Sequence, residues 1–307
     1  MISQSLTTNK HHTIMIRLLT AFLLSVATGT IASRATTIQP AENGKYCLTN
    51  GNLTMTVDAS KGGKILSFKY GTQEIISQSR WPESFGSTFW TSPQKEWYWP
   101  PVPEYDKKPY QVEQEDGKLM LTSEVSPKLN YRIRKTFSVD EQDQAFVVQY
   151  TIINESGETR KVAPWEITRV PNEGGLIFFE APVDSIWPAG LMNFQQAFEA
   201  AWYQPDEASE NRKVNADGQG WLAYCCNGLL LVKHFEDLNP SQPAPNEAEI
   251  QVYVNRGKTY IELESQGAYT TLQPNGQLTW TVRWYLQPCD AEPQPSVSLL
   301  QQAKKVK

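Results

Sequence analysis

The sequence predicts an all-β protein built as one large, mostly antiparallel β-sandwich. Short segments of alternating apolar and polar residues follow one another along most of the chain, with turn residues between them. After residue 35 no stretch keeps a helical period for a dozen residues, and a parallel sheet needs a helix between its strands. No linker rich in Pro and Ser divides the chain, so we expect a single domain over residues 36–307.

Strand and turn signals begin early in the chain. Residues 53–57 and 65–70 have the composition of strands, and Lys61-Gly62-Gly63 between them is typical of a turn. Further on, Asp116-Gly117 precedes residues 118–124, and an Asp-Gly pair is a strong signal for a two-residue hairpin turn. These signals predict strands that are joined by tight turns.

Alternation is clearest in three later segments. Residues 131–139 place apolar side chains on one face and polar ones on the other, and only Lys135 interrupts the apolar face. Residues 146–154 and 279–286 follow the same period of two. This period is typical of strands with one buried face.

Helices are expected to be few and short. Residues 195–202 and 296–304 are the best candidates. Neither lies in a regular succession of strand, helix and strand, so a parallel α/β architecture is disfavoured.

The first 35 residues are typical of a signal peptide. Arg17 supplies a positive charge, an apolar run of about 14 residues follows it, and Ala32, Ser33 and Ala35 suit a signal peptidase. The run is shorter than the roughly 20 residues that a membrane-spanning helix needs. We expect a periplasmic or secreted protein with no membrane span in its mature form, and a membrane anchor is the alternative interpretation.

The charge balance disfavours one class of partner. The whole chain carries a formal charge of −5, and removal of residues 1–35 takes away Lys10, Arg17 and Arg34 but no acidic residue, which leaves −8. Nucleic-acid binding proteins present basic surfaces. We therefore expect no nucleic-acid partner, whereas a neutral sugar is compatible with this charge.

The densest aromatic segment extends from Phe89 to Pro101. Its proline residues remove backbone donors and fix φ, so we expect a rigid loop that displays rings, among them Trp97 and Trp99. Sugars pack their C–H faces on aromatic rings while their hydroxyls seek polar groups, and Glu96 lies nearby. Two alternatives stay open: the rings fill one end of the core, or they form a surface for a protein partner.

Two further segments place charged side chains in strand patterns. In the first, Trp165 and Arg169 share one face and Glu166 lies on the other, so Arg169 is either paired with a carboxylate or directed into a polar pocket. In the second, Glu262 and Glu264 share one face. Two carboxylates so close repel each other unless they are solvated or paired, so this face is either solvent-exposed or contacts a sugar, with one Glu as a base.

The four cysteines raise the question of a disulfide. Cys47 lies near the first mature strand and Cys289 near the end of the last, so a Cys47–Cys289 bridge is one hypothesis and small buried side chains are the other. Cys225 and Cys226 lack the spacing of a zinc site. We expect no metal and no cofactor.

These clusters, in this order, resemble the galactose mutarotase-like (aldose 1-epimerase) superfamily, and more narrowly a family of secreted bacterial proteins with a Trp-x-Trp-Pro-Pro loop, here residues 97–101. The turn Gly62-Gly63-Lys64-Ile65 resembles the opening strands of that family. Residues 263–266, 272–276 and 279–286 resemble its closing strands and turn. The resemblance covers roughly residues 46–288 and implies a supersandwich of two large antiparallel sheets.

The resemblance also implies a catalytic assignment. In mutarotases a Glu on the closing strand takes the proton from the anomeric hydroxyl, and a His donates one to the ring oxygen. By this match Glu264 is the base. The region that would carry the His reads Pro164-Trp165-Glu166-Ile167-Thr168, and His234, the only histidine after residue 35, matches no catalytic position. Glu166 or Asp217 could act as the acid if burial raised its pKa.

We therefore predict an exported protein that binds a mono- or oligosaccharide without turnover. One alternative is an epimerase or mutarotase-type enzyme with Glu264 as its base, and another is a protein-interaction module that uses the aromatic loop. The predicted sugar-binding residues are Trp97, Trp99, Trp165, Glu166, Arg169 and His234.

Overall fold

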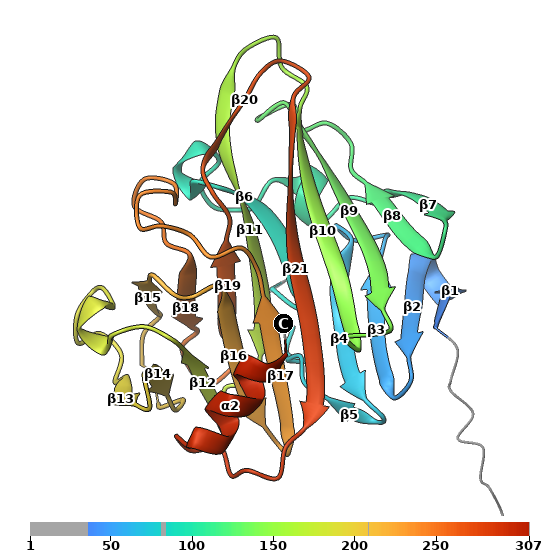
Figure 1. Cartoon of the computed structure of the whole chain (residues 1–307). Helices are drawn as coiled ribbons and strands as arrows, with labels where there is room; N and C mark the ends of the chain where they lie inside the picture. The colour runs from blue at the N-terminus through green and yellow to red at the C-terminus, as the bar shows by residue number, and fades with distance from the viewer. Residues whose placement is uncertain (1–35, 81–83, 208, 307) are drawn as a thin grey trace, which may run out of the picture. The chain divides into compact units, whose positions relative to one another are not determined.

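The computed structural model describes residues 36–80, 84–207 and 209–306. Within these residues the strands form two large antiparallel sheets (Figure 1). The predicted signal peptide, residues 1–35, lies outside the described residues. No helix in the described ranges is long and apolar enough to cross a membrane.

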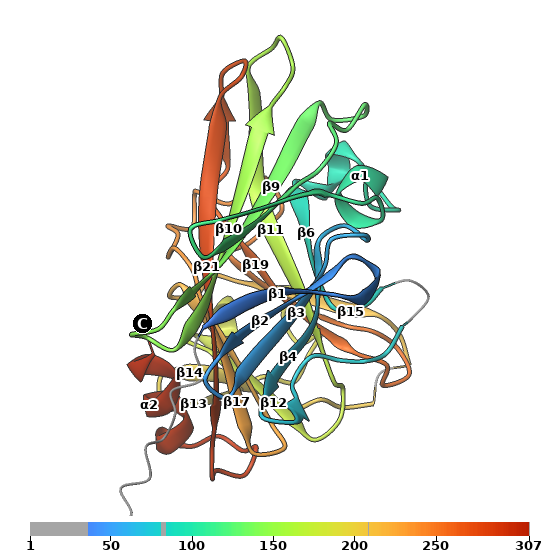
Figure 2. The ribbon, with the colours of Figure 1, turned by 90° about the vertical axis from the view of Figure 1, so that its right-hand side faces the viewer.

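Eleven of the described strands form one sheet. Its central path is, in spatial order, β1 (Thr37–Ala41), β2 (Lys45–Asn50), β3 (Leu53–Asp58), β4 (Lys64–Tyr70), β6 (Ser87–Ser92), β11 (Arg160–Val170), β19 (Ile261–Gln266), β18 (Ile250–Val254) and β15 (Arg212–Ala216). Two short strands pair off this path, β5 (Gln73–Glu74) with β4 and β20 (Thr270–Leu272) with β11. Figure 2 shows β1 to β4 side by side at the N-terminal edge.

The other sheet contains ten described strands. In spatial order they are β13 (Gln195–Ala197), β14 (Ala200–Tyr203), β12 (Gly175–Phe179), β16 (Trp221–Cys226), β17 (Leu229–His234), β21 (Gln277–Pro288), β10 (Ala145–Asn154), β9 (Tyr131–Asp140), β8 (Lys118–Thr122) and β7 (Gln111–Glu115). The short helices of the described residues are α1 (Pro103–Asp106), α2 (Val297–Lys305), η1 (Glu42–Gly44), η2 (Gln94–Glu96) and η3 (Val183–Ser185). The all-β, antiparallel prediction is confirmed.

Local turn chemistry explains two of the connections. Asp116 and Gly117 both have positive φ, which a two-residue hairpin turn of this hand requires, and they join β7 to β8 as predicted. The segment 195–202 was expected to be helical, and that prediction is wrong. Phe198 and Glu199 adopt positive φ and turn the chain back, so β13 and β14 pair as a hairpin.

The second helix prediction is confirmed by α2. The Ser296 hydroxyl accepts a hydrogen bond from the backbone N–H of Leu299 and so caps the first turn of the helix. Leu299, Leu300 and Ala303 are buried in an apolar cluster with side chains of the ten-stranded sheet. In Figure 1 the helix covers the region where β16 and β17 lie.

The main core lies between the two sheets and contains two buried lysines. Lys135, which interrupts the apolar face of β9, donates from Nζ to the backbone oxygens of Gly62 (2.7 Å) and Gly63 (3.2 Å) in the β3–β4 turn of the other sheet. Burial lowers the pKa of Lys135 to about 7. Its ammonium thus satisfies turn carbonyls that would otherwise lack a donor.

The second buried lysine crosses the sandwich to Glu166. Lys233 Nζ on β17 lies 2.5 Å from Glu166 Oε2 on β11, and both side chains are fully buried. Glu166 Oε1 accepts from the Tyr150 hydroxyl (2.6 Å) and from Trp284 Nε1 (3.1 Å). Glu166 therefore faces the ten-stranded sheet and links the two layers. The expectation that it contacts a sugar is corrected, because its carboxylate is enclosed by the core.

The hypothesis of a Cys47–Cys289 bridge is wrong. Cys47 lies on β2, in the eleven-stranded sheet, whereas Cys289 follows β21 in the other sheet. Cys289 Sγ lies 3.4 Å from Cys225 Sγ instead. The prediction assumed that strands from the two ends of the chain lie side by side. Here β2 and β21 belong to different sheets.

The close approach at Gly62 leads to a stability prediction. Gly62 has φ +67, and a Cβ there would lie 2.5 Å from the backbone oxygen of Asp106. We expect Gly62→Ala to lower the free energy of unfolding by about 3 kcal/mol, because backbone strain and a backbone clash add. Gly71→Ala is the matched control: its φ is +59, but a Cβ would meet open space, so about 1 kcal/mol of strain is expected. Equal losses in urea unfolding would contradict this account.

Candidate functional site

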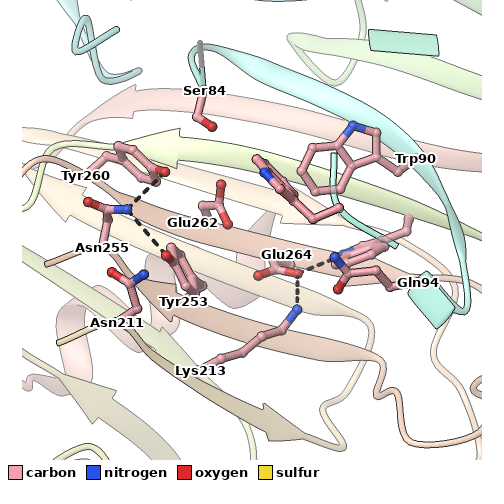
Figure 3. A pocket seen from close by; sticks show the side chains of 12 residues that line it. Ser84, Trp90, Gln94, Asn211, Lys213, Tyr253, Asn255, Tyr260, Glu262 and Glu264 are labelled. Atoms are coloured by element: carbon pink, nitrogen blue, oxygen red, sulfur yellow. Dashed lines mark hydrogen bonds and ion pairs between the residues drawn. The ribbon is translucent and has the colours of Figure 1, made fainter. Parts of the chain in front are cut away.

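A hollow of about 350 Å³ opens on the face of the eleven-stranded sheet that points away from the ten-stranded one (Figure 3). Five neighbouring strands contribute to its floor: β6, β11, β19, β18 and β15. The lining residues are Ser84, Trp90, Gln94, Trp99, Trp165, Asn211, Lys213, Tyr253, Asn255, Tyr260, Glu262 and Glu264. A volume of this size is within the range of small-molecule sites.

Strand alternation and register bring the predicted carboxylates together with the predicted tryptophan. Glu262 and Glu264 point to the same side of β19, and the register sets Arg169 of β11 opposite Glu262. Trp165 lies on the same face of β11, four residues before Arg169. Both carboxylates are buried on this face, and buried charges need internal partners.

Glu264 is the most unusual group of the hollow. Its Oε2 accepts hydrogen bonds from Trp165 Nε1 and from Lys213 Nζ, both at 2.8 Å (Figure 3). Its Oε1 is buried and has no hydrogen-bond partner among the described residues. Burial raises the pKa of Glu264 to about 7, Lys213 opposes that rise, and Glu262 adds to it. Glu264 therefore combines a raised pKa with one oxygen that no described residue satisfies.

Arg169 is paired, which was the first of its two predicted roles. Its guanidinium is almost completely buried and forms an ion pair of 2.7 Å with Glu262. The rings of Tyr260 and Trp90 lie 5.5 and 5.9 Å from the guanidinium carbon. Arg169 does not line the main hollow; it fixes Glu262 beside Glu264 and lines a smaller, adjoining hollow.

The aromatic loop places its two predicted tryptophans differently. Trp97 is only 2% exposed, and its Nε1 donates to the backbone oxygen of Thr91 at 2.8 Å. Its ring packs against Trp90 and Trp165, so the expected sugar contact of Trp97 is corrected to a supporting role. Trp99 is 63% exposed and lines the hollow, with its ring edge against Trp90. Burial of the other rings holds Trp99 at the rim.

His234 lies far from this constellation in the fold. It is the last residue of β17, in the ten-stranded sheet, and its ring makes an edge contact with Tyr285 at 6.0 Å. Because Lys233 points toward Glu166 between the sheets, the next side chain along the strand points to the opposite face. The expectation that His234 contacts the same ligand is therefore corrected.

Several functional candidates were missed by sequence reasoning. Lys213 of β15 lies opposite Tyr253 of β18, and Tyr253 lies opposite Glu262. The Lys213 side chain reaches across to Glu264. Asn255 Nδ2 donates to the hydroxyls of Tyr253 (3.3 Å) and Tyr260 (3.2 Å). The alternation of side chains within β15 and β18 can be recognised in the sequence. Nothing in the sequence indicates that these strands lie beside β19, which carries Glu262 and Glu264.

A second, smaller hollow of about 180 Å³ lies next to the first, and Trp99 lines both. The two hollows share Ser84, Trp90 and Trp99. Its wall includes Lys64, whose Nζ forms a buried ion pair of 3.1 Å with Asp106. Trp99 therefore borders both spaces.

The described residues hold no group of three or more His, Cys, Asp or Glu side chains that could bind a metal ion. Lys213 already occupies one oxygen of Glu264, and Arg169 pairs with Glu262. The side chains that line the hollow can supply hydrogen bonds, a ring for stacking and proton exchange at Glu264.

The two large antiparallel sheets form a galactose mutarotase-like fold, as similar solved structures show. A putative aldose 1-epimerase from Escherichia coli K12 is similar with a TM-score of 0.55 at 15% identity, over 83% of this chain and 100% of that one. A putative aldose 1-epimerase from Klebsiella pneumoniae gives 0.59 at 11% identity, over 85% and 83%. A galactose mutarotase-like protein from Lactobacillus casei gives 0.54 at 11% identity, over 80% and 100%.

Comparison by sequence alone does not detect this similarity. No protein-family model matches the chain, and no curated protein matches it. Identities of 9–15% among the structural matches show the fold, and they leave the activity to be argued from the site.

Proposed function

We propose that the hollow binds a carbohydrate and that the protein is an exported sugar-binding protein without turnover. The observation that supports this most is that an exposed ring, Trp99, and the polar side chains of Glu264, Asn211 and Asn255 line one hollow. An apolar ring and a few convergent polar groups are the features by which a site orients a ligand that has both C–H faces and hydroxyls.

The two acids considered from the sequence, Glu166 and Asp217, do not line the hollow, which favours binding over turnover. A proton donor must titrate near the working pH to be efficient. Burial, with Tyr260 nearby, raises the pKa of Tyr253 to about 12, which makes that hydroxyl a weak acid. Glu166, one of the acids considered from the sequence, is enclosed between the sheets, and Asp217 does not line the hollow. Within the described part of the chain, the one histidine, His234, lies in the other sheet.

The ligand can be longer than one sugar unit. Trp99 borders both hollows, so a second unit can extend past its ring toward Lys64 and Asp106. A disaccharide that binds more tightly than either of its monosaccharides would support this extended arrangement. Equal affinities would restrict the ligand to the larger hollow.

The proposal is tested with the full-length protein on a broad glycan array, followed by calorimetry with the best ligands. We expect saturable binding, with no acceleration of anomer exchange when fresh sugars are followed by NMR. No binding on the array at protein concentrations that detect millimolar affinities would overturn the proposal.

Trp99→Ala should weaken binding of the selected glycan about 10- to 30-fold, because a stacking ring that borders the ligand is lost. Tyr98→Ala is the matched control. Tyr98 is the adjacent residue and is 68% exposed, but it lines neither hollow. Calorimetry should find the Tyr98 variant within about twofold of the parent. Similar losses in both variants would place the ligand elsewhere on the loop.

A second candidate function, sugar epimerisation, is favoured by Glu264 itself. A buried carboxyl with a pKa of about 7 and an oxygen with no hydrogen-bond partner among the described residues is suited to accept a proton from an anomeric hydroxyl. Accelerated exchange of α and β anomers that is lost in Glu264→Gln would establish this function. Binding without acceleration would leave the first proposal in place.

A further inference from the structure

Two cysteines of the C-terminal half lie side by side in the fold. Cys225 is on β16, and Cys289 follows the last residue of β21. Both strands pair with β17, on its opposite edges. Beyond β21 the chain turns across the end of β17, where the backbone N–H of Cys289 donates to the oxygen of Gly228 in the β16–β17 turn (2.8 Å). This contact brings Cys289 Sγ to 3.4 Å from Cys225 Sγ.

The other two cysteines are directed elsewhere. Cys226 is the next residue on β16, so its side chain points to the opposite face, where its Sγ contacts the backbone oxygen of Glu173 at 3.6 Å. Cys47 lies in the eleven-stranded sheet. Among the described residues, Cys225 and Cys289 are thus the pair whose sulfurs are in contact.

The pair is buried but reachable from one side. Cys289 forms part of the wall of a surface hollow of about 540 Å³ between the end of β21 and α2, together with Asp290, Glu292 and Gln302. Cys225 lies behind it, within the apolar cluster that α2 covers. A small disulfide-carrying molecule can therefore approach Cys289 before Cys225.

We propose that Cys225 and Cys289 form a disulfide when the protein meets a disulfide donor such as oxidised glutathione. The bond fastens the segment between β21 and α2 onto β16. The sulfurs lie 3.4 Å apart, so an S–S bond of about 2.05 Å needs them to approach by little more than 1 Å. Export to an oxidising compartment, which is part of the proposed function, would supply such a donor.

Thiol–disulfide exchange accounts for every atom. Cys289 loses its thiol proton to water, and its thiolate attacks one sulfur of oxidised glutathione, forms a mixed disulfide and releases one glutathione thiolate. The Cys225 thiol then loses its proton to water, attacks the Cys289 sulfur and releases the second glutathione thiolate. The two glutathione thiolates take up the two protons from water. Two protein thiols are oxidised, and one glutathione disulfide is reduced. The side-chain contact with Cys225 lowers the pKa of Cys289, against the opposing effect of burial, which suits Cys289 to the first attack.

The bond should stabilise the folded protein. The two cysteines are 64 positions apart in the chain, so the bond would close a long loop in the unfolded state. For a domain of this size we expect the melting temperature to rise by roughly 5–10 °C over the reduced form. Cys47→Ser should keep this rise, and Cys289→Ser should lose it.

The test uses the full-length protein in a buffer of oxidised and reduced glutathione. After acid quenching and denaturation, iodoacetamide labels free thiols, and intact mass gives their number. We expect two labels, on Cys47 and Cys226, against four in fully reduced protein. Cys47→Ser should then carry one label, and Cys289→Ser should carry three.

If a variant fails to fold, the bond can still be located in the parent protein. The unreduced parent is digested with trypsin, and the linked peptides are identified by mass. The expected product joins the peptide of residues 214–233 to that of residues 284–304. Four labels after treatment with oxidised glutathione would overturn the proposal. So would a bond that persists in Cys289→Ser, since Cys289 would then not be one of its partners. Neither readout depends on sugar binding.

Discussion

Lys233→Met should lower the free energy of unfolding by about 3–5 kcal/mol, because it leaves Glu166 as an uncompensated charge between the sheets. The ammonium of Lys233 lies 2.5 Å from the carboxylate, and both side chains are fully buried. Tyr150 and Trp284 still donate to Glu166, but two neutral hydrogen bonds do not replace an opposite charge. Urea unfolding followed by tryptophan fluorescence measures the loss.

A second variant separates the charge effect from lost packing. Lys233→Met combined with Glu166→Gln removes both charges while the amide oxygen can still accept from Tyr150, so most of the stability should return. Lys258→Met is the matched control. Its ion pair with Glu207 is solvent-exposed, and we expect a loss below about 1 kcal/mol. A Lys233→Met variant within 1 kcal/mol of the parent would show that the pair does not hold the layers together.

Glu264→Gln should weaken binding of the selected glycan about 10- to 100-fold at pH 8.5 and remove most of its pH dependence. A hydroxyl that donates to an ionised carboxylate forms a stronger hydrogen bond than one that donates to a neutral amide, by about 1.5–3 kcal/mol in total. The pKa of Glu264 in the free protein is about 7, raised first by burial. The parent should therefore bind more tightly as the pH rises through 7 and more weakly as it falls.

Calorimetry at pH 5.5 and pH 8.5 on parent and variant measures this effect. Glu113→Gln is the control, since Glu113 is exposed on β7 at the far edge of the other sheet, and it should leave both affinities unchanged. Circular dichroism should show that the Glu264 variant remains folded. An unchanged pH profile in Glu264→Gln would remove Glu264 from the binding site.

Much of the scaffold was predictable because its signals are local. The period of two in residues 131–139 and the Asp116-Gly117 turn depend on neighbouring residues, and both appear in the structure as expected. Residues 195–202 misled the prediction because an apolar segment of that length suits a helix or a hairpin equally. The turn at Phe198 and Glu199, with packing on β12, decided between them.

The candidate site was predictable only in part, because local patterns show which side chains share a strand face but not which strands are neighbours. Alternation alone showed that Glu262 shares a face with Glu264, and that Trp165 shares one with Arg169. It did not show which of the two loop tryptophans, Trp97 or Trp99, is buried, because burial of Trp97 depends on contacts with Trp90 and Trp165 from other strands.

By itself, then, the sequence determined the all-β character, the facing of side chains along each strand and the residue types able to bind a sugar. Only the tertiary structure decided that Lys213 meets Glu264, that Glu166 is paired with Lys233 across the layers and that Cys289 lies beside Cys225. The reason is that side-chain direction follows from the backbone within a strand, whereas strand order follows from pairing between segments far apart in the chain.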